Sequence, residues 1–248
     1  MDSKEKTTRN NSETGNAKNV ENFQKLISFI TALGTRYNPT NPALLITALE
    51  AKFEESTAVL SNVKDAFSAN KLAISDREAA FSNLRKLITR TKNYYGSSGT
   101  SQGNLEDARS FTQKIQGSRA KPAPQAEGDS TEMVVSYTAS QQSYLQLIEH
   151  FNGLIEIYAK DPFYNPNEED LKLTTLRNYA ADLKAKNTAV IETYTTLSNA
   201  RIARNKSLYD EQTGLVAISK LVKRYVNGVI GTNAAEFKQI SSINFTTV

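Results

Sequence analysis

The feature of this sequence that most constrains its fold is a set of short blocks that occur twice in the same order. Tyr37-Asn38-Pro39 recurs as Tyr164-Asn165-Pro166 at an offset of 127 residues, and Thr57-Ala58-Val59 recurs as Thr188-Ala189-Val190 at an offset of 131. Because four added residues make about one turn of helix, an apolar helical stripe keeps roughly the same direction. The sequence therefore indicates an internal duplication of a helical unit.

Two further pairs of blocks extend the repeat on both sides. Phe23, Leu26 and Ile27 match Tyr144, Leu147 and Ile148 at an offset of 121, and Lys86, Leu87 and Arg90 match Lys220, Leu221 and Arg224 at an offset of 134.

The first two helices of the first copy are visible in the apolar spacing. Apolar residues three and four apart run from Val20 to Leu33 and predict a helix from about residue 19. The Tyr-Asn-Pro block ends it, because the residue before a proline is pushed out of the helical region. Asn41 and Pro42 then open a second helix. We expect its apolar face to consist of Leu45, Leu49, Phe53, Leu60, Val63 and Phe67.

A third helix is predicted by the capping-box spacing of Ser75-Asp76-Arg77-Glu78. This pattern implies a turn around Asn70 and a helix that ends by Gly96.

The second copy repeats this plan with longer helices. An apolar stripe from Leu145 to Tyr158 marks its first helix, Asn167 opens its second, and its third ends near Gly228 or Gly231. The sequence therefore predicts an all-α fold of two tandem three-helix (up-down-up) bundle units, residues 19–96 and 131–232. Residues 233–248 are expected to form a short helix and a tail that packs on the bundle through Ile243, Phe245 and Val248.

Two segments differ in composition from the repeated units. Residues 1–18 are polar and are expected to be a disordered tail. Residues 97–130 are rich in Gly, Ser and Pro and are expected to be a flexible linker, with one short helix around Leu105, Phe111 and Ile115. Residues 133–138 are interpreted as the frayed start of the second copy's first helix.

The composition excludes several kinds of chemistry. The chain has no cysteine, which excludes disulfides, thiol nucleophiles and zinc fingers. His150 is the single histidine and is expected to be exposed. The net charge of +4 is too small for a strongly basic nucleic-acid-binding arm. Because no apolar run reaches the roughly 20 residues of a membrane span and no signal peptide is visible, we expect a cytoplasmic protein without a membrane span.

The acidic clusters do not predict a metal site. Adjacent carboxylates on a helix point about 100° apart, so they cannot converge on one ion without another segment. We interpret Glu54-Glu55 as a solvated face and Glu168-Glu169-Asp170 as the start of a helix. Gly96-Ser97-Ser98-Gly99 lacks the end of a phosphate-binding loop. We therefore expect no metal, no cofactor, no small-molecule substrate and no enzymatic activity.

Candidate binding residues lie at the ends of the third helices. Lys86 and Arg90 are four residues apart, as are Lys220 and Arg224, so each pair shares a helical face, and Lys223 lies beside the second pair. They are suited to phosphate binding, or they complement the negative end of the helix dipole.

The repeated tyrosines, Tyr37 and Tyr164, are candidates for two equivalent docking points. Alternatively, each ring is buried at a helix junction and stabilises the turn.

The leading hypothesis is a non-catalytic interaction or scaffold protein that binds a protein partner or itself, since paired modules gain avidity from effective concentration. A nucleic-acid-associated accessory protein that uses the basic helix ends is the first alternative. An enzyme with a carboxylate-bound metal in a groove between helices is the second.

Overall fold

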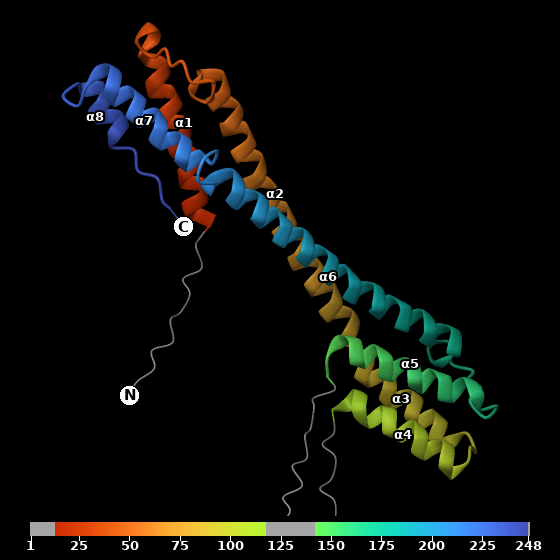
Figure 1. The fold of residues 1–248 in the computed structure, drawn as a ribbon. Helices are drawn as coiled ribbons and strands as arrows, with labels where there is room; N and C mark the ends of the chain where they lie inside the picture. Colours follow the sequence, from red (N-terminus) through yellow and green to blue (C-terminus); the bar gives the residue numbers. More distant parts are fainter. Residues whose placement is uncertain (1–12, 118–141, 248) are drawn as a thin grey trace, which may run out of the picture. The chain divides into compact units, whose positions relative to one another are not determined.

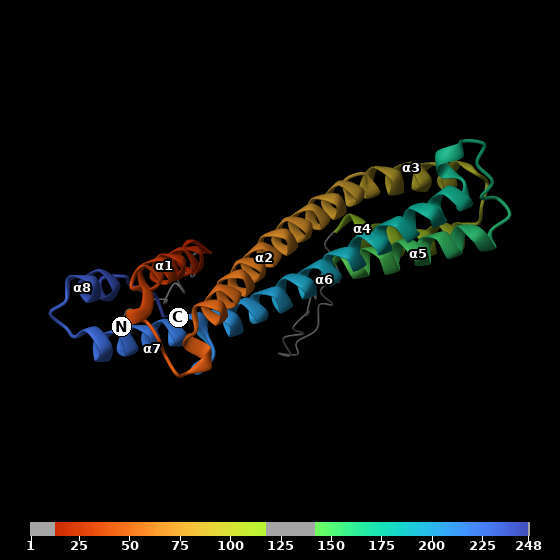
Figure 2. The same cartoon turned by 90° about the horizontal axis from the view of Figure 1, so that it is seen from above.

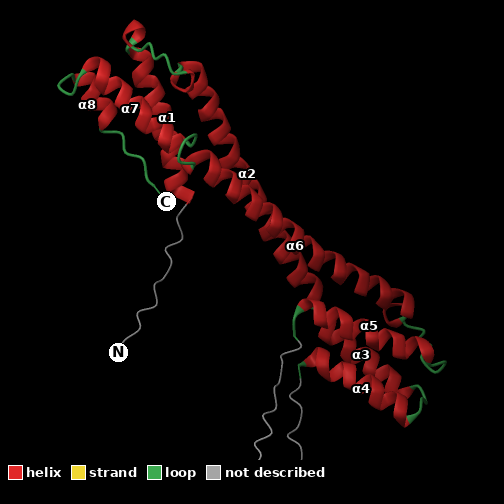
Figure 3. Cartoon of the chain, in the orientation of Figure 1, coloured by secondary structure: helices red, strands yellow, loops and turns green. Residues whose placement is uncertain are grey.

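The computed structural model describes residues 13–117 and 142–247, and within them the chain is all-helical, without a strand (Figure 1; Figure 3). The prediction of an all-α fold is thus confirmed for this part of the chain. The helices are α1 Glu13–Ala32, α2 Ile46–Phe81, α3 Leu84–Ser97, α4 Gln102–Gln116, α5 Tyr144–Lys160, α6 Leu173–Tyr209, α7 Leu215–Ile230 and α8 Ala235–Ser241. Short 3₁₀ turns cover η1 Gly34–Arg36, η2 Pro42–Leu44 and η3 Glu169–Leu171.

The chain forms two compact units that each draw on both halves of the sequence. Unit 1 comprises the described residues up to Asn70 together with those from Thr193 onward, and unit 2 comprises those from Lys71 to Glu192. The sequence pattern instead predicts the tandem units 19–96 and 131–232. The difference arises because α2 and α6, of 36 and 37 residues, each contribute one part to unit 1 and the other to unit 2.

The predicted turn around Asn70 and the predicted helix start at Ser75 are both wrong. These residues lie inside α2, which continues to Phe81. Asn70 lies within the helix, where its side chain is buried and donates a hydrogen bond to the hydroxyl of Thr193. A capping box is only a local pattern, and Ser and Glu are also tolerated on an exposed helical face.

The core of unit 1 joins α1 to α7 and α8 (Figure 2). Phe23, Leu26 and Ile30 of α1 are fully buried, as is Val222 of α7. These side chains lie three or four residues apart along α1, so one stripe of that helix supplies its part of the core. Gly34 ends this region with a φ of +56°, a left-handed conformation that favours glycine.

The C-terminal tail packs on unit 1, as predicted for Ile243 and Phe245, whereas Val248 lies outside the described residues. The side chain of Asn19 both donates to the carbonyl of Thr246 (2.9 Å) and accepts from its amide (2.8 Å). Asn22 donates to the carbonyl of Asn244 at 2.7 Å. The buried side chains of Asn19 and Asn22 on α1 therefore hold the tail through hydrogen bonds to its backbone.

The core of unit 2 joins α3, α4 and α5 to the adjoining parts of α2 and α6. Its largest fully buried side chains include Tyr95, Phe151, Leu154 and Tyr158. The expected flexible linker is wrong for residues 97–117, because α4 packs here and buries Ala108, Thr112 and Ile115. The short helix predicted within that segment is confirmed. Residues 118–130 of the expected linker, and residues 133–138, lie outside the described residues.

Only the last six residues of the expected N-terminal tail, 13–18, are described by the structure. Residues 13–18 belong to α1, so the prediction of disorder is wrong for them, and residues 1–12 lie outside the described residues.

The burial pattern of α1 and α5 gives the first pair of sequence blocks a different alignment. The buried Phe23, Leu26 and Ile27 of α1 correspond in spacing to the buried Phe151, Leu154 and Ile155 of α5, an offset of 128 and not 121. A shift of seven residues is two turns, so apolar periodicity alone does not separate the two registers.

Candidate functional site

Within unit 1, α2 and α6 run antiparallel and meet through a narrow layer of small and polar residues. The hydroxyls of Ser56 and Ser207 lie 3.5 Å apart, and the amide of Asn70 donates to the hydroxyl of Thr193 at 3.1 Å. Between these polar pairs, the apolar layer consists of Val63, Ala66, Leu197 and Ala200. Small residues let the two helices approach closely, but they bury little apolar surface.

Large apolar side chains of the same segment remain outside this layer. Phe67 is 52% exposed, Tyr194 is 61% exposed and Ile202 is 64% exposed. The apolar spacing of α2 predicts that Phe67 faces the core, and this prediction is wrong. Single exposed apolar residues are common on proteins, and of these three only Phe67 lines a groove of the described structure.

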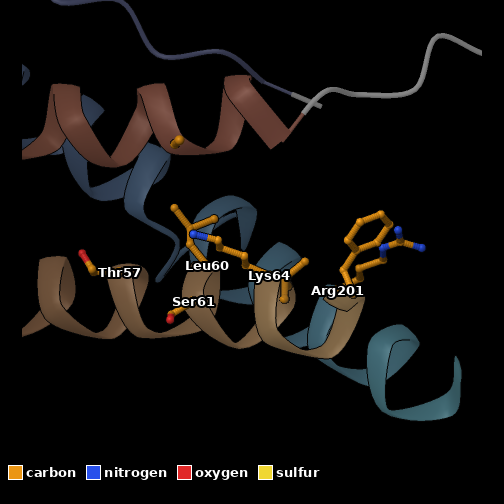
Figure 4. Close-up of a pocket in the computed structure, with 8 residues that line it drawn as sticks. Thr57, Leu60, Ser61, Lys64 and Arg201 are labelled. Carbon is orange, nitrogen blue, oxygen red and sulfur yellow. The ribbon is translucent and has the colours of Figure 1, made fainter. Parts of the chain in front are cut away.

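A groove of about 520 Å³ lies beside Phe67 and is the candidate functional site (Figure 4). Its walls come from three helices of unit 1, and we call it the α2 groove. It is lined by Thr57, Leu60, Ser61, Val63, Lys64 and Phe67 of α2, Ala17 of α1 and Arg201 of α6. In Figure 4 Thr57 lies near one end and Arg201 near the other, with the side chains of Leu60 and Lys64 between them. The lining surface is mostly apolar.

The charge at the groove has one sign. Among the described residues that line it, Lys64 and Arg201 are the charged ones, and both are exposed. Neither forms an ion pair with any acid of the described residues. The groove therefore combines an apolar floor with an unneutralised basic rim.

The other side of the α2 and α6 pair is different in character. A hollow of about 590 Å³ there is lined by alanines and polar residues, Asp65 among them, with Val59 as its one larger aliphatic side chain. It offers no large apolar side chain to a partner.

The predicted basic residues separate into engaged and free groups. Arg90 forms an ion pair with Asp170. Lys223 donates to the carbonyls of Ser241 (3.1 Å) and Ile243, and partial burial lowers its pKa. Lys86, Lys220 and Arg224 are exposed and have no ion pair among the described residues. Lys220 and Arg224 belong to unit 1 and Lys86 and Arg90 to unit 2.

Lys220 and Arg224 share a hollow of about 650 Å³ with two acids, Asp210 and Glu211. Asp210 is itself engaged, since its carboxylate accepts from the backbone of Gln212 and from the backbone and hydroxyl of Thr213. These hydrogen bonds, with that of the Thr213 backbone first, lower the pKa of Asp210. The two basic residues thus face a mixed-charge surface.

The repeated tyrosines occupy equivalent positions in the two units. The Tyr37 hydroxyl donates to the carbonyl of Leu44 at 2.7 Å, and the Tyr164 hydroxyl donates to the carbonyl of Leu171 at 2.9 Å. Both rings are buried, and burial raises the pKa of Tyr37 to about 12 and that of Tyr164 further still. Each ring also packs edge-on against a second tyrosine, Tyr225 and Tyr94 respectively. Tyr37 and Tyr164 therefore stabilise their respective turns by the same kind of hydrogen bond.

His150 differs from expectation. It is half-buried on α5, with its ring centroid 6.3 Å from that of Phe111 on α4, and its Nε2 is buried without a hydrogen-bond partner in the described part of the chain. Desolvation, with the nearby charge of Lys114, lowers its pKa. Within the described residues, His150 packs against Phe111 and its ring has no hydrogen-bond partner at Nε2.

Asp161 is a buried polar centre that the sequence analysis missed. Its carboxylate accepts hydrogen bonds from Thr100, from Tyr95 (2.5 Å), from Asn104 (2.9 Å) and from the Phe163 backbone (2.9 Å). These bonds, those of Thr100 and Tyr95 foremost, lower its pKa to about 2. The donors come from separate segments of unit 2, so no local pattern reveals the cluster. The side-chain donors Tyr95, Thr100 and Asn104 tie α3, α4 and their connection to the end of α5, which gives Asp161 a structural role.

Three of the clustered acids have partners of their own. Besides Asp170, Glu169 pairs with Lys172, and Glu55 pairs with Lys52 and accepts from Ser207. Over residues 13–117 and 142–247 no group of three or more potential ligands is placed to hold a metal ion. No helix in the same ranges has the length and apolar character that crossing a membrane requires.

Comparisons with protein-family models, with curated proteins and with solved structures found no match to this chain.

Proposed function

We propose that this chain is a non-catalytic helical protein that acts by binding another protein at the α2 groove. The observation that carries the proposal is the exposure of Phe67 beside an apolar groove whose neighbouring helix layer is too thin to cover it. Binding surfaces characteristically place an aromatic residue in or beside an apolar pocket with charged residues around it.

The internal duplication is a further part of the proposal. The order α1, η2, α2, α3, α4 recurs as α5, η3, α6, α7, α8, and the turns at Tyr37 and Tyr164 make the same hydrogen bond. The two copies exchange helices: α1 packs with α7 and α8 in unit 1, and α5 packs with α3 and α4 in unit 2. Besides its parts of α2 and α6, each unit would then contain one helix of one copy and two of the other. This is the pattern that a domain-swapped dimer acquires when its subunits are fused.

Nucleic-acid binding by the free basic residues Lys220 and Arg224 is the second candidate. Asp210 and Glu211 in the same hollow oppose it, because phosphates are repelled by nearby carboxylates. Binding of this kind would weaken steeply with salt and on reversal of both basic charges.

Site-specific photo-cross-linking in the native cell tests the leading proposal. A benzophenone-bearing phenylalanine analogue at position 67 is expected to give a discrete adduct with another protein. The same analogue at Phe29, an exposed phenylalanine of α1 that does not line the groove, is the matched control. No adduct at position 67, or the same adducts at both positions, would count against the proposal.

A further inference from the structure

We infer that the segment that occupies the α2 groove is an amphipathic helix of a partner protein whose apolar face is flanked by acidic residues. This inference rests on the proposed function and deepens it, because it names the chemistry of the partner.

The shape of the groove favours a helix. The lining residues Leu60, Lys64 and Phe67 recur at intervals of four and three along α2, so they form a straight ridge of the kind that packs against a second helix. The lined stretch from Thr57 to Phe67 covers ten residue steps, or about 15 Å, which matches about three turns of a partner helix. The described part of the chain has no strand edge beside the groove on which an extended peptide would pair.

The charge of the groove favours acidic flanks. Lys64 and Arg201 lie on the lining and have no acidic partner within the described ranges, so a partner's carboxylates would meet two free cations. Charges at the rim of an interface accelerate association and select the partner more than they add affinity. We therefore expect the acidic flanks to decide which helix binds, while Leu60 and Phe67 supply the apolar contact.

Two other occupants fit less well. In a twofold dimer of this chain the same patch would face itself, which would bring Lys64 and Arg201 against their own copies without a carboxylate among the described lining residues. Residues 1–12, which precede α1 in sequence, contain a single apolar residue, Met1, and more basic than acidic side chains. They offer neither the apolar face nor the negative charge that the groove requires.

A fluorescent label inside the groove allows a direct test. Because the chain contains no cysteine, a Ser61→Cys variant carries an environment-sensitive dye at one groove position, and Ser28→Cys on α1 is the control position. The probes are two synthetic helix-stabilised peptides of about 16 residues with the same leucine face, one flanked by glutamates and the other by lysines. The label at position 61, but not at position 28, should shift to the blue when the glutamate peptide binds.

We expect the glutamate peptide to bind about five-fold more tightly than the lysine peptide at low salt, since two exposed ion pairs are at stake. High salt should reduce this preference. The double variant Lys64→Glu, Arg201→Glu should reverse it while leaving the far-ultraviolet circular dichroism unchanged, because both side chains are exposed.

Four outcomes would overturn the inference. The peptides could bind equally, or neither could bind. Sodium laurate could shift the label at position 61 while neither peptide does, which would indicate an anionic amphiphile as occupant. Sedimentation could show a dimer that Phe67→Ser dissociates, which would indicate a second copy. A protein adduct at position 67 without any peptide charge preference would leave the proposed function standing and refute only the acidic helix.

Discussion

The side-chain amide of Asn70 on α2 donates to the hydroxyl of Thr193 on α6 at 3.1 Å, across 123 residues of sequence. The Ser56 and Ser207 hydroxyls make the equivalent polar layer two heptads earlier on α2. A polar residue at such an inward position fixes the register of paired helices at a cost in stability. The α2 and α6 pair of unit 1 is therefore well specified but thinly packed, which leaves Phe67 outside.

Replacing Asn70 with Ala should destabilise unit 1 by about 1 kcal/mol, because the variant loses a buried hydrogen bond and leaves a small cavity. Ser68→Ala, at an exposed position of the same helix, should change stability by less than about 0.5 kcal/mol. Urea unfolding measures both changes. Equal stability of the two variants would contradict a register-fixing role for Asn70.

Tyr37→Phe and Tyr164→Phe should each cost about 1–2 kcal/mol, since each leaves a carbonyl in a buried turn without its donor. The loss should be local: native-state hydrogen exchange should accelerate in unit 1 for the first variant and in unit 2 for the second. Tyr194→Phe removes an exposed hydroxyl and serves as the control. Exchange that accelerates in the wrong unit would refute the assignment of the two turns.

Unit 2 should lose stability in acid as Asp161 becomes protonated. Its pKa is lowered from 3.8 to about 2 in the folded protein, so the unfolded chain binds the proton first as the pH falls. The stabilisation is complete above about pH 4 and is lost between about pH 4 and pH 2. Thermal unfolding should show this loss in the wild type, and Asp161→Asn, less stable at pH 6, should show a flatter profile. Parallel profiles for the two proteins would contradict this role.

Gly153→Ala should destabilise the packing of α4 on α5 by about 1–3 kcal/mol, because a Cβ there would lie 2.4 Å from Cε1 of Phe111. Gly228→Ala is the matched helical control. A Cβ at Gly228 meets nothing within 4 Å, so the helix preference of alanine should stabilise α7 by about 0.5 kcal/mol. Thermal unfolding should thus give shifts of opposite sign, and a Gly153→Ala protein as stable as the wild type would show that Phe111 moves freely aside.

The helical content could be predicted from sequence because apolar residues recur at intervals of three and four. Phe23, Leu26 and Ile30 all lie on one stripe, and the structure buries all three. The spacing does not say which helix covers the stripe, so the packing of α1 with α7 and α8 could not be read from it. Likewise, the capping-box pattern at Ser75 predicts a helix start, but in the structure this residue lies inside the long helix α2.

The candidate site was harder to predict for a related reason. Phe67 continues the apolar spacing of Leu60 and Val63, and nothing local distinguishes it from a core residue. Its exposure depends on the partner helix, which contributes Leu197 and Ala200 to an apolar layer that does not include Phe67. The free cations at the groove depend equally on where α6 places Arg201. The spacing of apolar residues predicts which face of a helix is apolar. A binding site also depends on which helix packs against that face, and the spacing does not predict this.

The most direct test of binding at the α2 groove is quantitative mass spectrometry of proteins that co-purify with the tagged chain from its native cell. Three proteins are compared: the wild type, Phe67→Asp and the matched control Phe29→Asp, which places the same charge on an exposed position of unit 1 that does not line the groove. We predict that at least one stoichiometric partner falls about ten-fold or more with Phe67→Asp, as for an interface hot spot, and is retained by Phe29→Asp. Retention of every partner by Phe67→Asp, with both variants folded, would contradict binding at this groove.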